Sequence, residues 1–168
     1  VMYNDFVVLG PDSDPAAVRT APDAVSAFER ISRKGSVFIS RGDDSGTHKK
    51  EQQLWRLAHI EPEGCWYISA GQGMGAVLIM ADEKKAYTLS DRGTFIAYRD
   101  KVDLKILCEG DPFLFNPYSV IAVNPAKHPH VKYREACAFI DFLVSKKGRD
   151  LISGFRVKGE QLFIPISR

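Results

Sequence analysis

The sequence predicts a domain of the α/β class. Short runs of Val, Ile, Leu and Phe alternate along the chain with longer segments in which apolar residues recur every three or four positions. Clusters of Gly, Pro, Asn and Asp separate the two kinds of segment. A regular alternation of strands and helices is typical of α/β folds, in which helices cover a sheet.

The first predicted elements are a strand and a helix. Residues 1–9 alternate and then run apolar, and the breakers Gly10-Pro11-Asp12 end this strand. Thr20-Ala21-Pro22-Asp23 has the form of a capping box, a hydroxyl followed three residues later by a carboxylate, with Pro in the first turn. The buried face of the helix is then marked by Ala24, Val25, Phe28 and Ile31, and the helix is expected to end near Gly35.

Residues 36–51 are the most informative stretch. An apolar run, a polar turn and a segment of helical spacing predict a strand, a loop and a helix that continues to about residue 60. The first N–H groups of a helix lack intrahelical partners and carry partial positive charge, so they favour an anion. Ser45 and Thr47 add hydroxyl donors, Gly46 allows a close approach to the backbone, and Arg41 supplies a fork of N–H donors. The loop is therefore a candidate site for a small tetrahedral anion.

An ordinary structural role for the same residues stays open. Ser, Asp and Thr before a helix are common capping residues, and Arg41 beside Asp43 and Asp44 is compatible with a structural ion pair.

A second glycine-containing stretch raises an alternative function. Residues 65–69 predict a short strand, and Gly71–Ala76 then satisfies G-x-G-x-x-A, with Asp91 20 residues beyond Gly71. This is the spacing of a dinucleotide-binding fold. The preceding strand is short and flanked by polar residues, however, and Asp91 lies where a strand over residues 86–89 leads into a helix cap. Glycines that permit close packing at a helix start are the favoured interpretation.

The remaining elements complete the alternation of strands and helices. Strands are predicted over Leu104–Cys108 and Tyr118–Val123. A helix from Val131 has one apolar stripe and is expected to end at Ser145–Gly148, where basic residues and Gly suit a helix C-terminus. The helix stripe consists of Ala136, Phe139, Ile140 and Leu143, a final short helix is expected over residues 149–153, and residues 161–166 are expected to be extended.

Composition bounds the functional classes. The 168 residues are 45% hydrophobic and carry a formal charge of +2, without the clustered basic excess of a nucleic-acid surface. No apolar run approaches the ~20 residues that span a bilayer, and Val1 does not begin a signal peptide. Cys65, Cys108 and Cys137 have no Cys-x-x-Cys or metal-ligand spacing; Cys137 is expected to be a buried apolar residue, and one disulfide is compatible with an oxidising compartment.

Several motifs together resemble the tungstate-binding component of ABC transporters. They are Ser40–Glu51, Trp66-Tyr67 with Gly71–Gly75, Tyr87–Thr94, Asn116-Pro117-Tyr118, and the flanking Met2–Val7 and Val123–Pro129. The resemblance runs essentially from end to end, and the Arg41–Thr47 loop is its most specific part.

The resemblance implies a type II periplasmic binding fold, with two α/β lobes joined by two crossover strands that close on an oxyanion. It assigns residues 1–9 to the first crossover strand, 10–115 to an α/β lobe carrying the oxyanion loop, and 116–168 to the return crossover strand, within Tyr118–Val123, and the C-terminal helices. It implies oxyanion binding by Arg41, Ser45, Gly46 and Thr47, no catalysis and no cofactor. The implied location is periplasmic or otherwise extracytoplasmic, and the implied partner is the membrane permease of the transporter.

One departure from the family concerns the opposite wall of the anion site. The family begins with a further lobe-forming segment that includes a loop rich in Thr and Ser, and nothing before Val1 corresponds to it. The chain is therefore expected to hold one lobe with the crossovers, without most of the other lobe. A single wall leaves the anion half solvated, so this piece is expected to bind weakly on its own.

The choice of anion depends on Asp43. Phosphate near neutral pH keeps a proton that a carboxylate can accept, whereas tungstate, molybdate and sulfate are fully deprotonated and are repelled by a carboxylate. The resemblance favours tungstate and then molybdate, with a phosphate or sulfate receptor as the alternative. An oxyanion-sensing regulatory domain also stays open. An enzyme would need a nucleophile and a base, for which Ser45 with His48 or His59 is the nearest pair.

Overall fold

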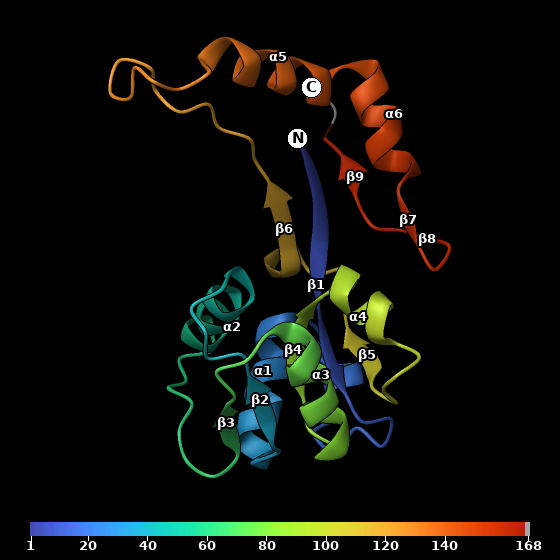
Figure 1. Ribbon diagram of the computed structural model, residues 1–168. Coiled ribbons are helices and arrows are strands. Elements are labelled where there is room, and N and C mark those ends of the chain that lie inside the picture. The colour runs from blue at the N-terminus through green and yellow to red at the C-terminus, as the bar shows by residue number, and fades with distance from the viewer. Residues whose placement is uncertain (167–168) are drawn as a thin grey trace. The chain divides into compact units, whose positions relative to one another are not determined.

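The computed structural model describes residues 1–166, and their contacts divide into two units. One unit comprises Asp5–Phe115, and the other comprises Val1–Asn4 with the residues that follow Phe115. Each unit is described by itself. The α/β class predicted from the sequence is confirmed, because strands and helices alternate through Asp5–Phe115 (Figure 1).

The larger unit contains an antiparallel sheet around β1 (Met2–Gly10), of which the residues from Asp5 onward belong to this unit. β4 (Thr88–Asp91) and β5 (Lys105–Cys108) pair with β1 on its two edges, both antiparallel. β2 (Phe38–Ser40) and β3 (Tyr67–Ser69) pair in parallel, and a bridge from Phe38 to Tyr87 joins β2 to the segment that leads into β4. The carboxyl ends of β2 and β3 therefore lie side by side, which is where open α/β sheets bind ligands.

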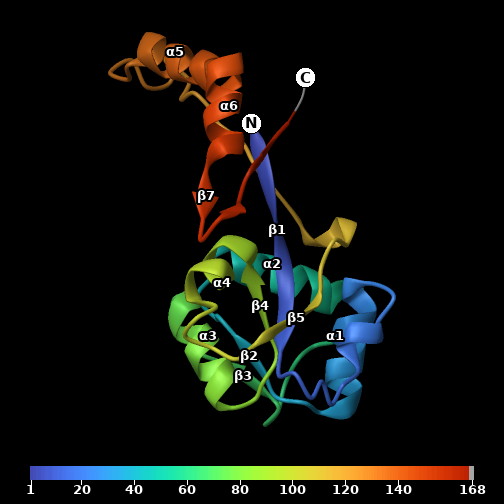
Figure 2. The same ribbon diagram turned by 90° about the vertical axis from the view of Figure 1, so that its right-hand side faces the viewer.

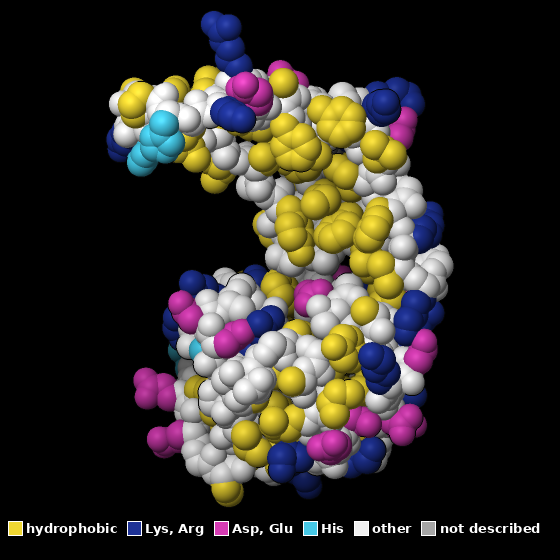
Figure 3. All heavy atoms as spheres, in the orientation of Figure 1, with side chains coloured by type: hydrophobic (Ala, Val, Ile, Leu, Met, Phe, Trp, Pro, Cys, Tyr) yellow, Lys and Arg dark blue, Asp and Glu magenta, His cyan; other side chains and the backbone are white. Residues whose placement is uncertain are grey.

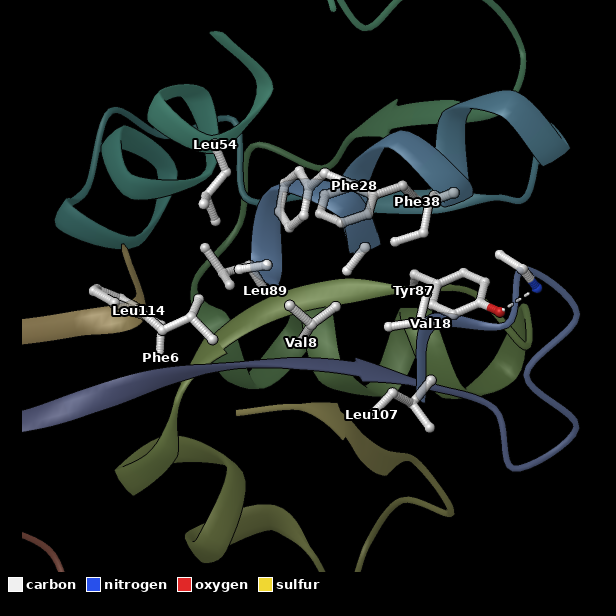
Figure 4. Packing of buried hydrophobic residues seen from close by; sticks show 14 of the residues in the cluster. Phe6, Val8, Val18, Phe28, Phe38, Leu54, Tyr87, Leu89, Leu107 and Leu114 are labelled. Atoms are coloured by element: carbon white, nitrogen blue, oxygen red, sulfur yellow. Dashed lines mark hydrogen bonds between the residues drawn. The ribbon is translucent and has the colours of Figure 1, made fainter. Parts of the chain in front are cut away.

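Helices cover both faces of this sheet, as Figure 2 shows. Phe6 and Val8 of β1 pack with α1 (Ala24–Lys34) and α2 (Gly46–Leu57), whereas Val7 and Leu9 pack with α3 (Met74–Glu83) and α4 (Arg92–Tyr98). The alternation follows from the two-residue period of a strand, and burial on both faces explains why β1 ends in a continuous apolar run. Figure 4 shows the first of these clusters, including the hydrogen bond from the Ala16 N–H to the Tyr87 hydroxyl.

The start of α1 corrects one prediction. Asp23, not Thr20, is the N-cap: its carboxylate accepts a hydrogen bond of 2.6 Å from the Ser26 N–H. Thr20 lies instead in the 3₁₀ turn η1 (Val18–Thr20), where its hydroxyl donates to the Ala17 carbonyl at 3.1 Å. The capping-box interpretation was wrong because Asp can cap a helix by itself. The predicted end at Gly35 is confirmed, with Gly35 at φ +64°.

The smaller unit departs more from the sequence predictions. Its strands are β6 (Phe115–Tyr118), β7 (Arg156–Val157), β8 (Glu160–Gln161) and β9 (Ile164–Pro165), and β6 follows the 3₁₀ turn η2 (Pro112–Leu114) of the larger unit. The predicted strand Tyr118–Val123 is wrong, since strand structure ends at Tyr118 and Ile121 is 85% exposed. An apolar run forms a strand only where another strand pairs with it.

The helices of the smaller unit are α5 (Tyr133–Val144) and α6 (Lys146–Gly154). The predicted end of the helix at Ser145–Gly148 is confirmed, because α5 ends at Val144 with Ser145 as its C-cap. Ser145 is also the N-cap of α6, since its Oγ accepts from the Gly148 N–H at 3.1 Å. The predicted short helix over 149–153 is part of α6. No residue of α5 is fully buried, so Cys137 is partly exposed rather than buried.

Burial is very unequal between the units. Both core clusters belong to Asp5–Phe115, whereas only Asn4, Gly148 and Leu162 are buried among the described residues of the smaller unit. Hydrophobic side chains gather on the surface of this unit in Figure 3. The exposed large hydrophobic residues of the unit include Phe139, Phe142, Leu151 and Phe155. The candidate site is therefore considered within the larger unit, whose core holds its elements in place.

Candidate functional site

The loop between β2 and α2 has the local structure that the sequence predicts. β2 ends at Ser40 and α2 begins at Gly46. Ser45 caps the helix, since its Oγ accepts a hydrogen bond of 3.3 Å from the His48 N–H. Within the described chain, nothing accepts from the N–H groups of Gly46 and Thr47. The first turn of α2 therefore presents two open donors together with the positive end of the helix dipole.

Arg41 is held by Asp43. The Arg41 Nε–H donates to Asp43 Oδ2 at 3.0 Å, and Nη2 forms a second, short contact with the same oxygen. Asp43 Oδ1 accepts from the Ser45 N–H at 3.2 Å. The hydrogen bonds from Ser45 and then from Arg41 lower the pKa of Asp43 to about 2. The ion pair predicted as a structural role is thus confirmed for Asp43, whereas Asp44 pairs with Lys49 at 3.5 Å.

The ion pair leaves part of Arg41 open. Two of its five N–H donors serve Asp43, and in the described chain no acceptor meets Nη1. The side chain is only 19% exposed, so its direction is restricted by its surroundings. Arg41 therefore retains N–H donors for a second acceptor.

Thr47 combines burial with an open hydroxyl. The residue is 7% exposed. Among the described residues, every side-chain nitrogen or oxygen that is fully buried has a hydrogen-bond partner. The Thr47 hydroxyl has no partner within these residues, so it is not fully buried. That hydroxyl must therefore reach the surface, where it can donate to a ligand at the helix front.

A second loop supports the first one. The backbone of the β3–α3 connection is tied to it by two hydrogen bonds: Ala70 N–H to Ser40 carbonyl at 2.9 Å, and Gln72 N–H to Arg41 carbonyl at 3.2 Å. Gly42 has φ +62°, and a Cβ at this position would lie 1.9 Å from Ser69 Oγ. Glycine is needed here both for its backbone conformation and for the close approach of the loops.

Sequence reasoning missed Glu51 as a separate functional candidate. Glu51 is 2% exposed and lies on the same face of α2 as Leu54 and Trp55. Burial raises the pKa of its carboxyl, although hydrogen bonds from Tyr67, Ser40 and Trp55 oppose the shift. The sequence did contain a signal for its burial: Glu51 lies three and four positions before Leu54 and Trp55, on the apolar stripe of the predicted helix.

The second arginine of the quoted motifs is bound by two carboxylates. Arg92 donates from Nε and Nη2 to the Asp5 carboxylate at 2.6 Å each, and from Nη2 to Glu109 at 2.6 Å. These carboxylates, Asp5 first, raise the pKa of Arg92. Arg92 is thus held by two carboxylates, whereas Arg41 is held by Asp43 alone.

The glycine stretch of the dinucleotide alternative has a packing role. A Cβ on Gly75 would lie 2.3 Å from the Tyr98 hydroxyl oxygen, so glycine allows α3 and α4 to approach. Asp91 caps α4, accepting from the Thr94 N–H at 2.8 Å and from the Thr94 hydroxyl at 2.7 Å. Both observations agree with the structural interpretation of this motif.

The hydrogen bonds of His48 do not form a Ser–His pair. Ser45 Oγ accepts from the backbone of His48, while its ring Nδ1 accepts from the Asp44 N–H at 3.0 Å. His48 and Ser69 instead line an open hollow of about 480 Å³ beside α2, whose lining includes none of Arg41, Ser45, Gly46 and Thr47. Within residues 1–166 there is no cluster of His, Cys, Asp and Glu suited to a metal ion, and no helix long and apolar enough to cross a bilayer.

Comparison with known proteins places the chain in a family. Residues 1–147 match the family described as a PBP superfamily domain. The tungstate-binding protein TupA of Peptoclostridium acidaminophilum is 48% identical over 98% of this chain and 59% of its own length.

Two solved structures extend the comparison. The tungstate ABC transporter protein of Geobacter sulfurreducens has 52% identity and a TM-score of 0.81, covering 92% of this chain and 66% of that one. TupA of Desulfovibrio alaskensis has 43% identity and a TM-score of 0.88, covering 99% and 69%. The chain belongs to the PBP superfamily, in the family of tungstate-binding components of ABC transporters.

The match covers nearly the whole chain but only part of its relatives. The chain spans between 50% and 62% of the length of the curated relatives that it matches. The expected periplasmic-binding fold is confirmed for the part that is present.

Proposed function

We propose that this chain is part of an extracytoplasmic binding protein that captures tungstate, or molybdate, for an ABC transporter. The observation that supports it is a single loop that holds both the open N–H groups of Gly46 and Thr47, at the front of a 12-residue helix, and the remaining donors of Arg41. Asp43 links the two parts, because it accepts from Arg41 and from the Ser45 N–H. Relatives that are 43% to 52% identical bear the name tungstate-binding or tungstate transporter protein. The family supports a membrane permease as the partner and a periplasmic location.

In the proposed complex, the oxyanion lies at the front of α2. The N–H groups of Gly46 and Thr47, the hydroxyls of Ser45 and Thr47, and the guanidinium of Arg41 donate hydrogen bonds to its oxygens. All of these donors are polar or cationic, and no reacting group is required.

The position of Asp43 supports a fully deprotonated anion. Its carboxylate is occupied by Arg41 and by the Ser45 N–H, and with a pKa of about 2 it stays charged at neutral pH. Both carboxylate oxygens already accept hydrogen bonds within the loop, so neither is directed at the protonated oxygen of a ligand. This arrangement favours tungstate, molybdate or sulfate over hydrogen phosphate.

Calorimetric titration with tungstate, molybdate, sulfate and phosphate tests the proposal. We expect tungstate to bind most tightly, the R41A variant to lose measurable binding, and the H48A variant to retain it, because the His48 ring serves the Asp44 N–H. Circular dichroism confirms that both variants are folded. Tungstate binding that survives R41A and fails in H48A would place the ligand elsewhere, and preferred binding of phosphate would assign the protein to the alternative receptor class.

A further inference from the structure

Glu51 is a buried carboxylate that the proposed binding site does not use directly. Its Oε2 accepts from the Ser40 hydroxyl at 2.8 Å, and its Oε1 accepts from Trp55 Nε1 at 3.2 Å and from the Tyr67 hydroxyl at 2.7 Å. Among the described residues, no Lys, Arg or His forms a salt bridge with it. A buried carboxylate without a cation is costly, so its three donors have to replace the hydrogen bonds of water.

The three donors belong to the elements that surround the oxyanion loop. Ser40 is the last residue of β2 and directly precedes Arg41. Tyr67 begins β3, whose last residue, Ser69, lies against Gly42. Trp55 is part of α2 itself. Through Glu51, therefore, the strand that enters the loop, the neighbouring strand and the helix that leaves the loop share one buried contact.

Glu51 lies close enough to the start of α2 for its hydrogen bonds to restrict the position of the first helical turn. Glu51 lies five positions after Gly46, which is about 7.5 Å along a helix axis at about 1.5 Å per residue. A helix anchored so close to its first turn cannot rotate or slide without moving the N–H groups of Gly46 and Thr47 relative to Arg41.

We propose that Glu51 is the positioning residue of the oxyanion loop: by joining Ser40 to α2 and Tyr67, it holds the open N–H groups of Gly46 and Thr47 in register with the Arg41 guanidinium. This inference rests on the proposed function. The hydrogen bonds, rather than the negative charge, carry the effect.

Two substitutions separate hydrogen bonding from charge. In E51Q the amide oxygen keeps the bonds from Trp55 and Tyr67, and the amide nitrogen donates to Ser40, whose hydroxyl can accept as well as donate. In E51L all three bonds are lost at similar side-chain volume. T88A is the matched control, because it removes a buried hydrogen bond of 2.8 Å to the carbonyl of Ile39, one residue before Ser40 on β2, and leaves the three hydrogen bonds of Glu51 in place.

The first readout is tungstate affinity by calorimetry. We expect E51Q to bind within about twofold of the unsubstituted protein, E51L to bind at least about tenfold more weakly, and T88A to bind normally. If E51L does not fold, S40A removes one of the three bonds and is expected to weaken binding several-fold. Normal affinity in E51L or S40A would overturn the inference, as would equal losses in E51L and T88A. Weak binding by E51Q would contradict the proposal that the hydrogen bonds of Glu51, rather than its charge, position the loop.

The second readout needs no ligand. Amide hydrogen exchange of residues 46–48 in the free protein reports how firmly the helix front is held. We expect faster exchange in E51L, or in S40A, and unchanged exchange in E51Q and T88A. If the unsubstituted protein failed to bind tungstate, the proposed function would be wrong, and exchange would still decide the positioning role: unchanged exchange in the variants would refute it.

Discussion

Asp43 accepts from Nε and Nη2 of Arg41 with one oxygen and from the Ser45 N–H with the other. The same carboxylate thus orients the guanidinium and holds the residue that caps α2. Such a pair of roles explains how an acidic residue can lie beside a proposed anion site: its charge is balanced by Arg41, and the remaining donors of Arg41 keep a defined direction.

Thr47→Val should weaken tungstate binding without unfolding the protein. Valine preserves the shape of this 7% exposed side chain and removes the hydroxyl that reaches the surface. Losing one hydrogen bond to a charged ligand corresponds to about tenfold in affinity. Calorimetry measures the effect and thermal unfolding serves as control. An affinity equal to that of the unsubstituted protein would remove Thr47 from the site.

Gly42→Ala should destabilise the protein and weaken binding together. The backbone has φ +62°, and the added Cβ would approach Ser69. We expect a loss of about 1–3 kcal/mol in the free energy of unfolding, measured by urea denaturation.

Gly35→Ala is the control for Gly42→Ala. Gly35 has a similar φ of +64° at the end of α1, with nothing within 4 Å of an added Cβ. It should cost about 1 kcal/mol from backbone strain alone and leave tungstate affinity unchanged. Equal effects of the two substitutions on affinity would contradict the close approach of the two loops.

Asp91→Ala should act on stability. The variant loses the cap of α4, including the bond from the Thr94 N–H at 2.8 Å, and is expected to lose about 1 kcal/mol in the free energy of unfolding. Asp23→Ala, which removes the cap of α1, provides a comparison of the same kind. Binding of NADH that disappears in Asp91→Ala, detected by fluorescence, would instead revive the dinucleotide alternative.

Glu51→Gln should change how stability depends on pH. Burial raises the pKa of Glu51 in the folded state above its ordinary value of 4.5. Below that value the carboxyl is protonated in both states; as pH rises through the folded pKa, the unfolded state ionises first and the wild-type protein loses stability relative to Gln. Urea unfolding from pH 4 to 8 should therefore show a growing advantage of Glu51→Gln. A difference that does not vary with pH, or that shrinks, would contradict this prediction.

Local patterns predicted well wherever neighbouring residues decide the outcome. The strand, loop and helix over residues 36–60 were predicted because Ser45 caps a helix with its own side chain and because apolar spacing reports one buried face. The end of α1 at Gly35 and the cap at Asp91 are local in the same sense. The ligand-binding role of Arg41, Ser45, Gly46 and Thr47 stays a prediction.

Errors arose where one residue type suits two structures. Ser145 ends α5 as predicted, but it also caps the next helix, since a serine hydroxyl can accept from the N–H three residues later. That helix therefore begins at Lys146 rather than at residue 149. Tyr118–Val123 has strand composition, but strand structure ends at Tyr118. The sequence of an apolar run does not show whether another strand will pair with it.

The sequence by itself determined the α/β class, the family and the chemical inventory of the loop, because these depend on residue types and on spacing within single elements. Only the tertiary structure decided that Asp43 rather than Asp44 pairs with Arg41, that Asp5 and Glu109 bind Arg92, and that Glu51 joins Ser40, Tyr67 and Trp55. The physical reason is that a side chain's charge and donors are fixed by its chemistry, whereas the acceptors that use them come from segments that meet only when the chain has folded.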